Sequence, residues 1–443
     1  MSFPRYPEYK NSGVEWLGKV PAHWEIAAVK RLFHIIGGST PASDVSRFWD
    51  GDVLWATPAD LSGSGLELQS TLRTITEAGV ASCGTTVAPV GSIILSTRAP
   101  IGSLAIAARP MCTNQGCKTL VPGSLASSRY FAYVLSVASP ELNLRGRGST
   151  FLELSGDELG RFAVVCPPVR EQHIISRFLD HETAKIDALV AEQERLIALL
   201  KEKRQAVISH AVTKGLNPAA SMKHSGSAWL GQVPANWGVA RLRYVSPQLT
   251  VGIVVEPSKY YNDQGVPALR SLNIRPGKIM LNNLVYLSEE SNELLGKSRL
   301  NAGDIVAVRT GQPGTAAVIP QELDGCNCID LIIIRRPSVG SSEYLCRYLE
   351  SDSAVAQFAD GSGGAIQQHF NVSAAQDLVV PVPPPEEQLA ISEFVQNQVE
   401  DIDKLIEEVQ RGKELLLLRR GALITAAVTG QIDVRGLASA EAA

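Results

Sequence analysis

Apolar residues recur at helical spacing along two long stretches of the chain. The first runs from Glu171 to Thr213 without a proline or glycine, and the second runs from Glu386 to Val428 with only Gly412 and Gly421 as breaks. Each stretch predicts one α-helix, and the first would be about 65 Å long at ~1.5 Å per residue. Such a helix with one narrow apolar stripe needs a partner helix, so we expect the two to pack together, with the glycines softening the second.

The charges along both predicted helices run from acidic to basic. Residues 171–194 hold six acids and two bases, whereas residues 195–214 hold five bases and one acid. The second helix repeats this order, with acids up to Glu408 and bases from Arg411. An antiparallel pair sets each acidic half beside a basic half, while a parallel pair sets acid beside acid. The same gradient would arise if each helix only complemented its own dipole, but we favour the antiparallel pair.

Outside these helices the pattern shortens to strand-like runs, and it is duplicated. The motif Trp-Leu-Gly-x-Val-Pro-x-x-Trp occurs at 16–24 and at 229–237, an offset of 213 (229 − 16). The motif Pro-Pro-x-x-Glu-Gln opens each helix, at 167–172 and 383–388, an offset of 216 (383 − 167). Two offsets that agree this closely indicate a repeated unit of about half the chain.

The two regions between these motifs share a frame but not their loops. Each is roughly 140 residues rich in Val, Ile, Thr and Gly, which is typical of an α+β domain with more strand than helix. The run at 91–98 matches 303–309, and a short helix at 130–136 matches one at 344–351. The glycine-rich loops that follow differ, which is expected of one scaffold that presents two binding surfaces. A pseudo-twofold molecule suits a pseudo-twofold partner, of which double-stranded DNA is the commonest.

The composition limits the classes of function. A formal charge of −4 and a pI near 6.0 argue against a freestanding DNA-binding protein, which normally carries a basic excess. The start has no apolar signal segment and no run approaches the ~18 residues of a membrane span, so a cytoplasmic location is expected. The seven cysteines form no CxxC pair and are expected to be buried, reduced thiols. Since no nucleotide-binding, metalloprotease or hydrolase motif occurs, the chain is expected to be a recognition protein rather than an enzyme.

Taken together, these motifs resemble the specificity subunit of type I restriction-modification systems. The tandem tryptophan motif, the Pro-Pro-x-x-Glu-Gln helix openings and the Ala-Val-Thr endings at 211–213 and 427–429 carry the resemblance, which covers about residues 8–435. It implies an α+β fold of two pseudo-twofold-related target-recognition domains joined by an antiparallel coiled coil. It further implies that each domain reads one half of a bipartite, asymmetric DNA target, and that the coiled coil sets the spacing.

The resemblance also implies domain limits and partners. The expected parts are a first recognition domain at 1–165, the first helix with its link at 166–218, a second domain at 219–380, the second helix at 381–435 and a flexible tail at 436–443. The expected partners are double-stranded DNA, two adenine-methylating modification subunits docked on the coiled coil and, through them, restriction-translocation subunits. S-adenosylmethionine, ATP and magnesium are expected on those partners, and no cofactor or metal on this chain. Partner subunits would also supply phosphate contacts that an acidic chain lacks. The alternative is a duplicated coiled-coil protein scaffold that binds no DNA, which the negative charge favours.

Polar and basic residues in the mismatched loops are the candidate DNA contacts. For each one alone, a solvated residue or a phosphate contact is the plainer interpretation; as a set we expect them to be enriched for contacts with DNA. They are Arg98, Arg145, Arg147, Ser149 and Thr150 in the first domain, and Arg309, Thr310, Gln312, Gln367, Gln368 and His369 in the second.

The repeated motifs also predict two packing arrangements. The motif tryptophans, Trp16, Trp24, Trp229 and Trp237, are expected to pack against the end of a long helix rather than to stack on bases, because duplex DNA offers no free base faces. The first helix leads directly into the second tryptophan motif. For the repeat to be complete, the end of the second helix must meet the first motif, so we expect the two chain termini to be neighbours.

Overall fold

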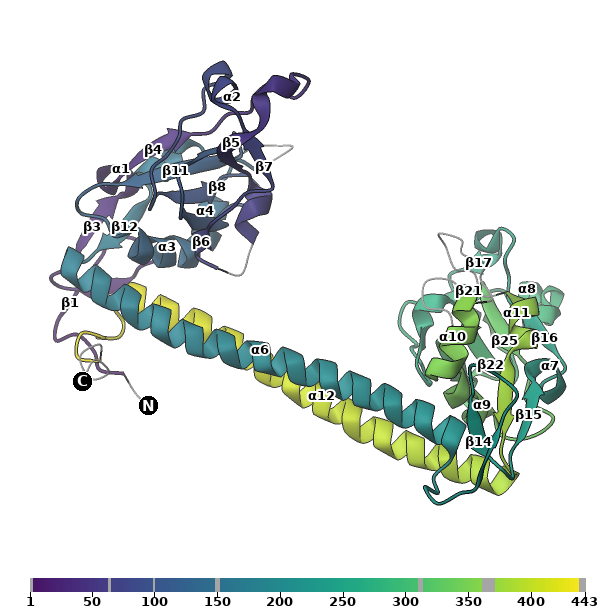
Figure 1. The fold of residues 1–443 in the computed structure, drawn as a ribbon. Helices are drawn as coiled ribbons and strands as arrows, with labels where there is room; N and C mark the ends of the chain where they lie inside the picture. The colour runs from purple at the N-terminus through teal and green to yellow at the C-terminus, as the bar shows by residue number, and fades with distance from the viewer. Residues whose placement is uncertain are drawn as a thin grey trace. The chain divides into compact units, whose positions relative to one another are not determined.

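The chain divides into two compact units, each with one β-rich domain and a part of both long helices (Figure 1). Unit 1 comprises Met1–Gln193 and Gly412–Ala443, and unit 2 comprises Glu194–Arg411. The structure, a computed structural model, describes residues 3–62, 65–98, 100–147, 152–309, 314–360 and 371–437.

Both predicted helices are present, and they pack together. They are α6, Val169–Lys214, and α12, Pro385–Val428, which continues through both of its glycines. In unit 1 Arg420 Nε of α12 lies 2.8 Å from Asp187 Oδ1 of α6. In unit 2 Arg204 Nε of α6 lies 2.9 Å from Asp403 Oδ1 of α12. Residue numbers rise along one helix as they fall along the other, which confirms the antiparallel pair and the acid-to-base pairing.

The domain of unit 1 is built on two sheets. The larger has the strand order β4-β11-β8-β9-β6 and the smaller the order β10-β5-β7, in which β10 runs parallel to β5. The strands are β1 Tyr9–Asn11, β2 Lys19–Pro21, β3 Glu25–Ala28, β4 Phe33–Gly37, β5 Trp49–Ala56, β6 Glu67–Leu68, β7 Arg73–Ile75, β8 Ile93–Ser96, β9 Leu104–Ala107, β10 Met111–Thr113, β11 Cys117–Pro122 and β12 Ala163–Cys166. The short helices are α1 Val29–Leu32, α2 Glu77–Ser82, α3 Ser128–Val137, α4 Ser139–Leu144 and α5 Gly156–Arg161, with 3-10 turns η1 Ser46–Phe48 and η2 Pro58–Ser62.

Unit 2 repeats this plan with different loops. Its sheets have the orders β16-β25-β22-β23 and β17-β21-β18-β24, and β24 again runs parallel to β18. The strands are β13 Met222–His224, β14 Gln232–Pro234, β15 Gly238–Arg241, β16 Leu249–Val251, β17 Tyr261–Asn262, β18 Val266–Leu269, β19 Ile274–Arg275, β20 Lys278–Ile279, β21 Val285–Leu287, β22 Ile305–Val308, β23 Ala316–Val318, β24 Asn327–Cys328, β25 Leu331–Ile334 and β26 Val379–Val382. The helices are α7 Leu242–Val245, α8 Glu289–Leu294, α9 Ser342–Leu349, α10 Asp352–Asp360 and α11 Val372–Asp377, with 3-10 turns η3 Pro257–Tyr260, η4 Ser271–Asn273, η5 Gly296–Ser298 and η6 Gln321–Leu323.

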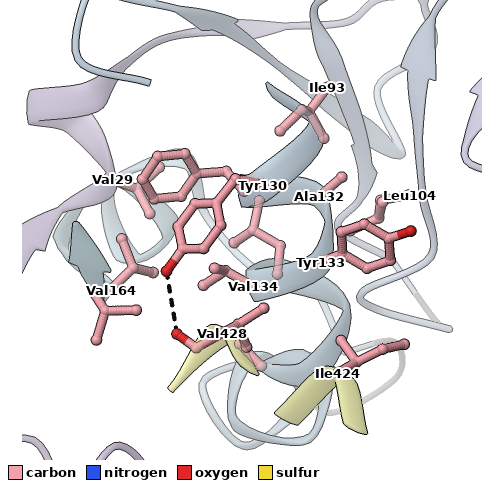
Figure 2. Packing of buried hydrophobic residues seen from close by; sticks show 14 of the residues in the cluster. Val29, Ile93, Leu104, Tyr130, Ala132, Tyr133, Val134, Val164, Ile424 and Val428 are labelled. Atoms are coloured by element: carbon pink, nitrogen blue, oxygen red, sulfur yellow. Dashed lines mark hydrogen bonds between the residues drawn. The ribbon is translucent and has the colours of Figure 1, made fainter. Parts of the chain in front are cut away.

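Each domain shares its hydrophobic core with the ends of the long helices. In unit 1 one cluster joins Tyr130 of α3 to Ile175 of α6 and Ile424 of α12. Figure 2 shows the hydroxyl of Tyr130 donating to the main-chain oxygen of Val428, over 3.1 Å. In unit 2 the equivalent Tyr344 hydroxyl donates to Val212 O of α6 over 3.0 Å. Because helix and domain bury one continuous apolar surface, we expect each β-rich domain and the helix segments against it to unfold together.

The two ends of the chain meet within unit 1. The amide of Asp433 donates to Pro4 O over 2.8 Å, and the hydroxyl of Tyr9 donates to Gly430 O over 3.0 Å. The guanidinium carbon of Arg435 lies 4.7 Å from the ring centre of Tyr6. The expectation that the termini are neighbours is therefore confirmed for residues 3–437.

Candidate DNA-recognition surfaces

The helix-opening glutamine fixes each domain on its long helix. In unit 1 Gln172 Oε1 accepts the amide of Ser127, the residue before α3, over 2.8 Å, and its Nε2 donates to Pro167 O over 2.9 Å. In unit 2 Gln388 Oε1 accepts the amide of Ser341, before α9, over 2.9 Å. Both glutamine side chains are buried. The register of α3 against α6 is thus repeated by α9 against α12.

The glutamate beside that glutamine differs between the two units. Glu171 Oε1 accepts the hydroxyl of Tyr6 over 2.6 Å and the indole N–H of Trp24 over 3.0 Å, and its Oε2 lies 2.8 Å from His23 Nε2. Burial and the contact with Glu171 raise the pKa of Tyr6 far above its ordinary value. In unit 2 the equivalent Glu387 accepts the amide of Asn236 over 3.3 Å. The N-terminal segment is thus fastened to the start of α6 through one carboxylate.

The tryptophans act as packing residues at three of the four positions. Trp24 and Trp237 are fully buried, and Trp16 stacks on the ring of Phe162 with 5.6 Å between centroids. These three confirm the structural interpretation. Trp229 is 42% exposed, because Leu378 takes the place of Phe162 in unit 2 and no aromatic ring covers it among the residues that the structure describes.

Two candidate arginines of the first domain come together around Glu153. Arg98 follows β8, and its Nε and Nη2 both lie 3.2 Å from Glu153 Oε2. Arg147 exchanges two main-chain hydrogen bonds of 3.0 Å with the same residue. The Arg147 side chain is exposed and that of Arg98 is 42% exposed. An exposed ion pair contributes only ~0–1 kcal/mol, so Arg98 can exchange Glu153 for a phosphate at little cost.

Arg145 lies apart from this pair. It follows α4, and its guanidinium carbon lies 5.1 Å from the ring centre of Phe162, which stacks on Trp16. The contact is with the aromatic packing beneath the tryptophan motif. Arg145 therefore has a structural partner that the loop pattern did not predict.

The candidate arginine of the second domain is held by an acid from a neighbouring turn. Arg309 follows β22, as Arg98 follows β8, and its Nη1 lies 2.8 Å from Asp330 Oδ1. Asp330 has a φ of 51°, in the left-handed region, at the turn between β24 and β25. The Nε of Arg309 is buried without a hydrogen-bond partner among the residues that the structure describes. The Arg309 side chain is less exposed than that of Arg98, at 28% against 42%.

The other candidates lie outside the described residues. They are Ser149, Thr150, Thr310, Gln312, Gln367, Gln368 and His369. They stay predictions from the sequence.

Lys118 is a basic residue that the loop pattern did not single out. It belongs to β11, where it pairs with Gly37 of β4, and its Nζ lies 3.6 Å from the position that a Cβ on Gly37 would take. Gly37 leaves room for the side chain to cross the edge strand. The signal in the sequence was that Lys118 is the single charged residue of its strand.

The described residues offer little for other chemistry. Across 3–62, 65–98, 100–147, 152–309, 314–360 and 371–437 no group of three or more His, Cys, Asp or Glu residues is arranged to hold a metal ion. Among the helices in these ranges, none is long and apolar enough to cross a bilayer. All seven cysteines are free thiols, and five are buried. Burial raises the pKa of Cys117 to about 12, which keeps it protonated and unreactive.

Comparison with known proteins gives matches to parts of the chain and also to nearly all of it. The family profile of the type I restriction modification DNA specificity domain matches residues 21–197. The type I restriction enzyme MjaIX specificity subunit of Methanocaldococcus jannaschii is 24% identical, over 97% of this chain and 98% of that protein. The EcoBI specificity subunit of Escherichia coli is 26% identical, over 68% of this chain and 65% of that protein.

Solved structures share the fold. A chain from a structure of type I restriction-modification complex assembly and conformational transition gives a TM-score of 0.72 at 14% identity, covering 92% of this chain and 98% of that one. The crystal structure of the HsdS subunit from Thermoanaerobacter tengcongensis gives 0.53 at 14% identity, covering 93% and 98%.

The fold is a duplicated α+β unit built on a pair of long helices. The chain is similar over nearly its whole length to specificity subunits of type I restriction-modification systems, and part of it matches the DNA specificity domain of these systems.

Proposed function

We propose that each β-rich domain reads one half of a bipartite, asymmetric DNA sequence. The recognition domains would extend over residues 1–165 and 219–380, with the helices and their link between them and a tail from 436. The observation that carries the proposal is that two domains repeat the same anchoring contacts yet differ at the loops after β8 and β22. When two domains share a scaffold but differ in their loops, each can bind a different ligand while both are anchored to the helices in the same way.

Within this proposal the helical pair sets the distance between the half-sites and docks two modification subunits. Restriction subunits would join through the modification subunits, and S-adenosylmethionine, ATP and magnesium would be bound by those partners. The partners would also provide phosphate contacts, because this chain has a formal charge of −4. We propose the cytoplasm as the place of action.

A mobility-shift series tests DNA recognition directly. The target sequence is first found by sequencing methylated adenines in the host genome. Duplexes with both half-sites, one half-site or neither are then titrated with the chain alone and with its modification subunit. Recognition predicts sequence-specific binding that falls when either half-site is changed. A scaffold that binds no DNA would gain no sequence-specific binding in any combination.

Substitution of the Glu153-linked arginines tests the surface of the first domain. Arg98→Ala with Arg147→Ala should weaken binding, and Lys10→Ala, which removes an exposed charge from β1, is the matched control. If both arginines bind phosphates, binding should weaken equally on specific and random DNA, and the salt slope should fall by ~1 for each phosphate that is no longer neutralised. If either reads a base, the effect should be confined to the first half-site. Unchanged binding would remove both residues from the interface.

A further inference from the structure

Unit 2 contains a cavity of about 600 Å³ between its β-rich domain and α12. We name it the Glu343 pocket. Its principal lining residues are Gly277, Glu343 and Arg347 from the domain and Leu389, Glu393 and Gln396 from α12. This volume lies within the range of ~300–1,000 Å³ that is typical of ligand-binding sites in proteins.

Unit 1 fills the equivalent place with an arginine of its own. The register fixed by Gln172 and Gln388 aligns Asp180 with Gln396, and the equivalent Tyr130 and Tyr344 align Arg129 with Glu343. Arg129 Nε donates to Asp180 Oδ1 over 2.9 Å. Its Nη1 donates to Glu67 Oε1 of β6 over 2.9 Å. One guanidinium therefore joins the domain of unit 1 to its long helix.

Two substitutions change this place in unit 2. Glu343 replaces Arg129, and the carboxamide of Gln396 replaces the carboxylate of Asp180. Arg347 donates its Nη2 to Gln396 Oε1, and Gly277 lies beside β23, where its amide donates to Ala316 O. A side chain at Gly277 is excluded, because its φ is 67° and a Cβ there would lie 2.4 Å from Arg347 Nη1.

The charges of the pocket suit a cation. Glu343 and Glu393 are exposed carboxylates at its mouth. The charge of Arg347 is already balanced, since its Nη1 lies 3.2 Å from Glu350 Oε2 and its Nη2 donates to Gln396 Oε1. Leu389, 56% exposed, adds an apolar wall. An arginine side chain matches this set, because its methylene stem covers apolar surface while its planar guanidinium pairs with carboxylates.

We propose that the Glu343 pocket receives an arginine side chain from a modification subunit. The partner's guanidinium then pairs with Glu343 of the domain and Glu393 of the helix, and adds a second link beside the hydrogen bond from Arg347 to Gln396. This inference rests on the proposed assembly with modification subunits and adds the place and the chemistry of one contact.

Charge removal in the pocket tests the inference. The double variant Glu343→Gln with Glu393→Gln keeps the shape of the pocket and removes both carboxylates. The affinity of the full chain for its modification subunit, measured by titration calorimetry, should fall at least tenfold. Glu322→Gln, an exposed glutamate on η6 of the same unit, should leave the affinity unchanged. Equal affinities for the double variant and the unsubstituted chain would overturn the proposal.

A second variant fills the pocket from within. Glu343→Arg with Gln396→Asp copies the Arg129–Asp180 pair into unit 2 and should exclude the partner's arginine, again weakening association at least tenfold while the melting temperature is kept or raised. If this variant does not fold, the double carboxamide variant decides the matter. A variant that folds and associates normally would count against the pocket as the docking place.

Chemical footprinting identifies the occupant. Phenylglyoxal modifies accessible arginines, so one arginine of the modification subunit should be protected in the complex with the unsubstituted chain and exposed in the complex with the double carboxamide variant. Protection that does not depend on Glu343 and Glu393 would overturn the assignment. A second result would also overturn the assignment: the pocket binds N-acetyl-arginine amide tightly, but the double carboxamide variant still binds the modification subunit with unchanged affinity. The pocket would then bind a small free cation. If the unsubstituted chain fails to bind the modification subunit at all, the proposed assembly itself fails, and this occupant fails with it.

Discussion

Replacing Glu171 by alanine should destabilise unit 1 far more than the same change at Glu387 destabilises unit 2. Both glutamates occupy the third helical position of a long helix and follow the same Pro-Pro motif. Glu171 is buried, at 6% exposure, and accepts from Tyr6 and Trp24. Glu387 is half-buried and makes one hydrogen bond of 3.3 Å, with Asn236, among the residues that the structure describes.

The magnitude follows from the groups left without partners. A hydrogen bond to a charged group contributes ~1.5–3 kcal/mol, and a buried donor that loses its acceptor costs ~1–3 kcal/mol. Glu171→Ala strands the indole N–H of Trp24, which is fully buried, and the hydroxyl of Tyr6. We therefore expect a loss of about 3–5 kcal/mol in unit 1. Glu387→Ala should cost ~0.5–1 kcal/mol, because its single hydrogen bond is long and partly exposed.

Hydrogen exchange measured by mass spectrometry separates the two units. In Glu171→Ala, exchange should accelerate in peptides of the N-terminal segment, the start of α6 and the end of α12, because Tyr6 no longer fastens the terminus. Peptides of unit 2 should be unchanged. The variant Glu387→Ala serves as the matched control, with small changes confined to the start of α12.

Equal effects of the two substitutions would refute this reasoning. Equal losses would mean that the hydrogen bonds from Tyr6 and Trp24 add no stability of their own. Both glutamates would then stabilise the protein only by placing a negative charge at the positive end of a helix dipole. An intermediate variant, Glu171→Gln, keeps an acceptor oxygen without the charge. It should lose less stability than the alanine variant, since Tyr6 and Trp24 both donate to Oε1 and the amide oxygen can take its place.

Four further predictions concern other parts of the chain. Burial and the hydrogen bond to Asp180 raise the pKa of Tyr133 to about 12. The contribution of Tyr133 to the stability of the fold is therefore present below pH 10 and disappears as the pH rises to 12. In alkaline denaturation the stability advantage of the unsubstituted chain over Tyr133→Phe, ~2 kcal/mol or less, should vanish over that range. Joining the termini by a flexible linker and opening the chain between 215 and 225 should preserve folding and partner binding, with circular dichroism as the check. Inserting one helical turn in both long helices should lengthen the spacer of the methylated sequence, expected at roughly 10 bp between half-site centres, and leave the half-sites unchanged. Changing Gln367 and Gln368 to alanine should cost ~1–3 kcal/mol of binding on the second half-site alone if either reads a base.

Much of the fold could be predicted because the periodic apolar residues and the repeated motifs of this chain are visible in the sequence itself. The apolar spacing and the opening prolines predicted both long helices within a few residues, and the charge gradient predicted that they run antiparallel. The duplication also predicted that the termini meet, because a repeated motif requires a repeated neighbour. The flexibility expected at Gly412 and Gly421 left no interruption, since α12 continues through both.

The candidate DNA-contact surface was harder to predict from the sequence. Arg98 and Arg147 were grouped by loop membership, but their common partner Glu153 lies 55 residues from Arg98. Arg145 belongs to the same loop by sequence, yet it packs on Phe162. Loop composition indicates exposure and charge, whereas the direction of each side chain depends on contacts that close only when distant segments meet.

The sequence by itself determined the number of units, the two long helices and their direction, because hydrophobic spacing and charge order act between neighbours along a helix. Tertiary structure alone decided which partners the differing residues of the two copies contact. Arg129 and Glu343 occupy equivalent places, and so do Glu171 and Glu387, but their side chains meet different partners. Unit 1 has a filled site where unit 2 has a pocket, because segments distant in the sequence pack together there. At such a place, the exchange of one side chain changes the space, the charge and the hydrogen bonds at once.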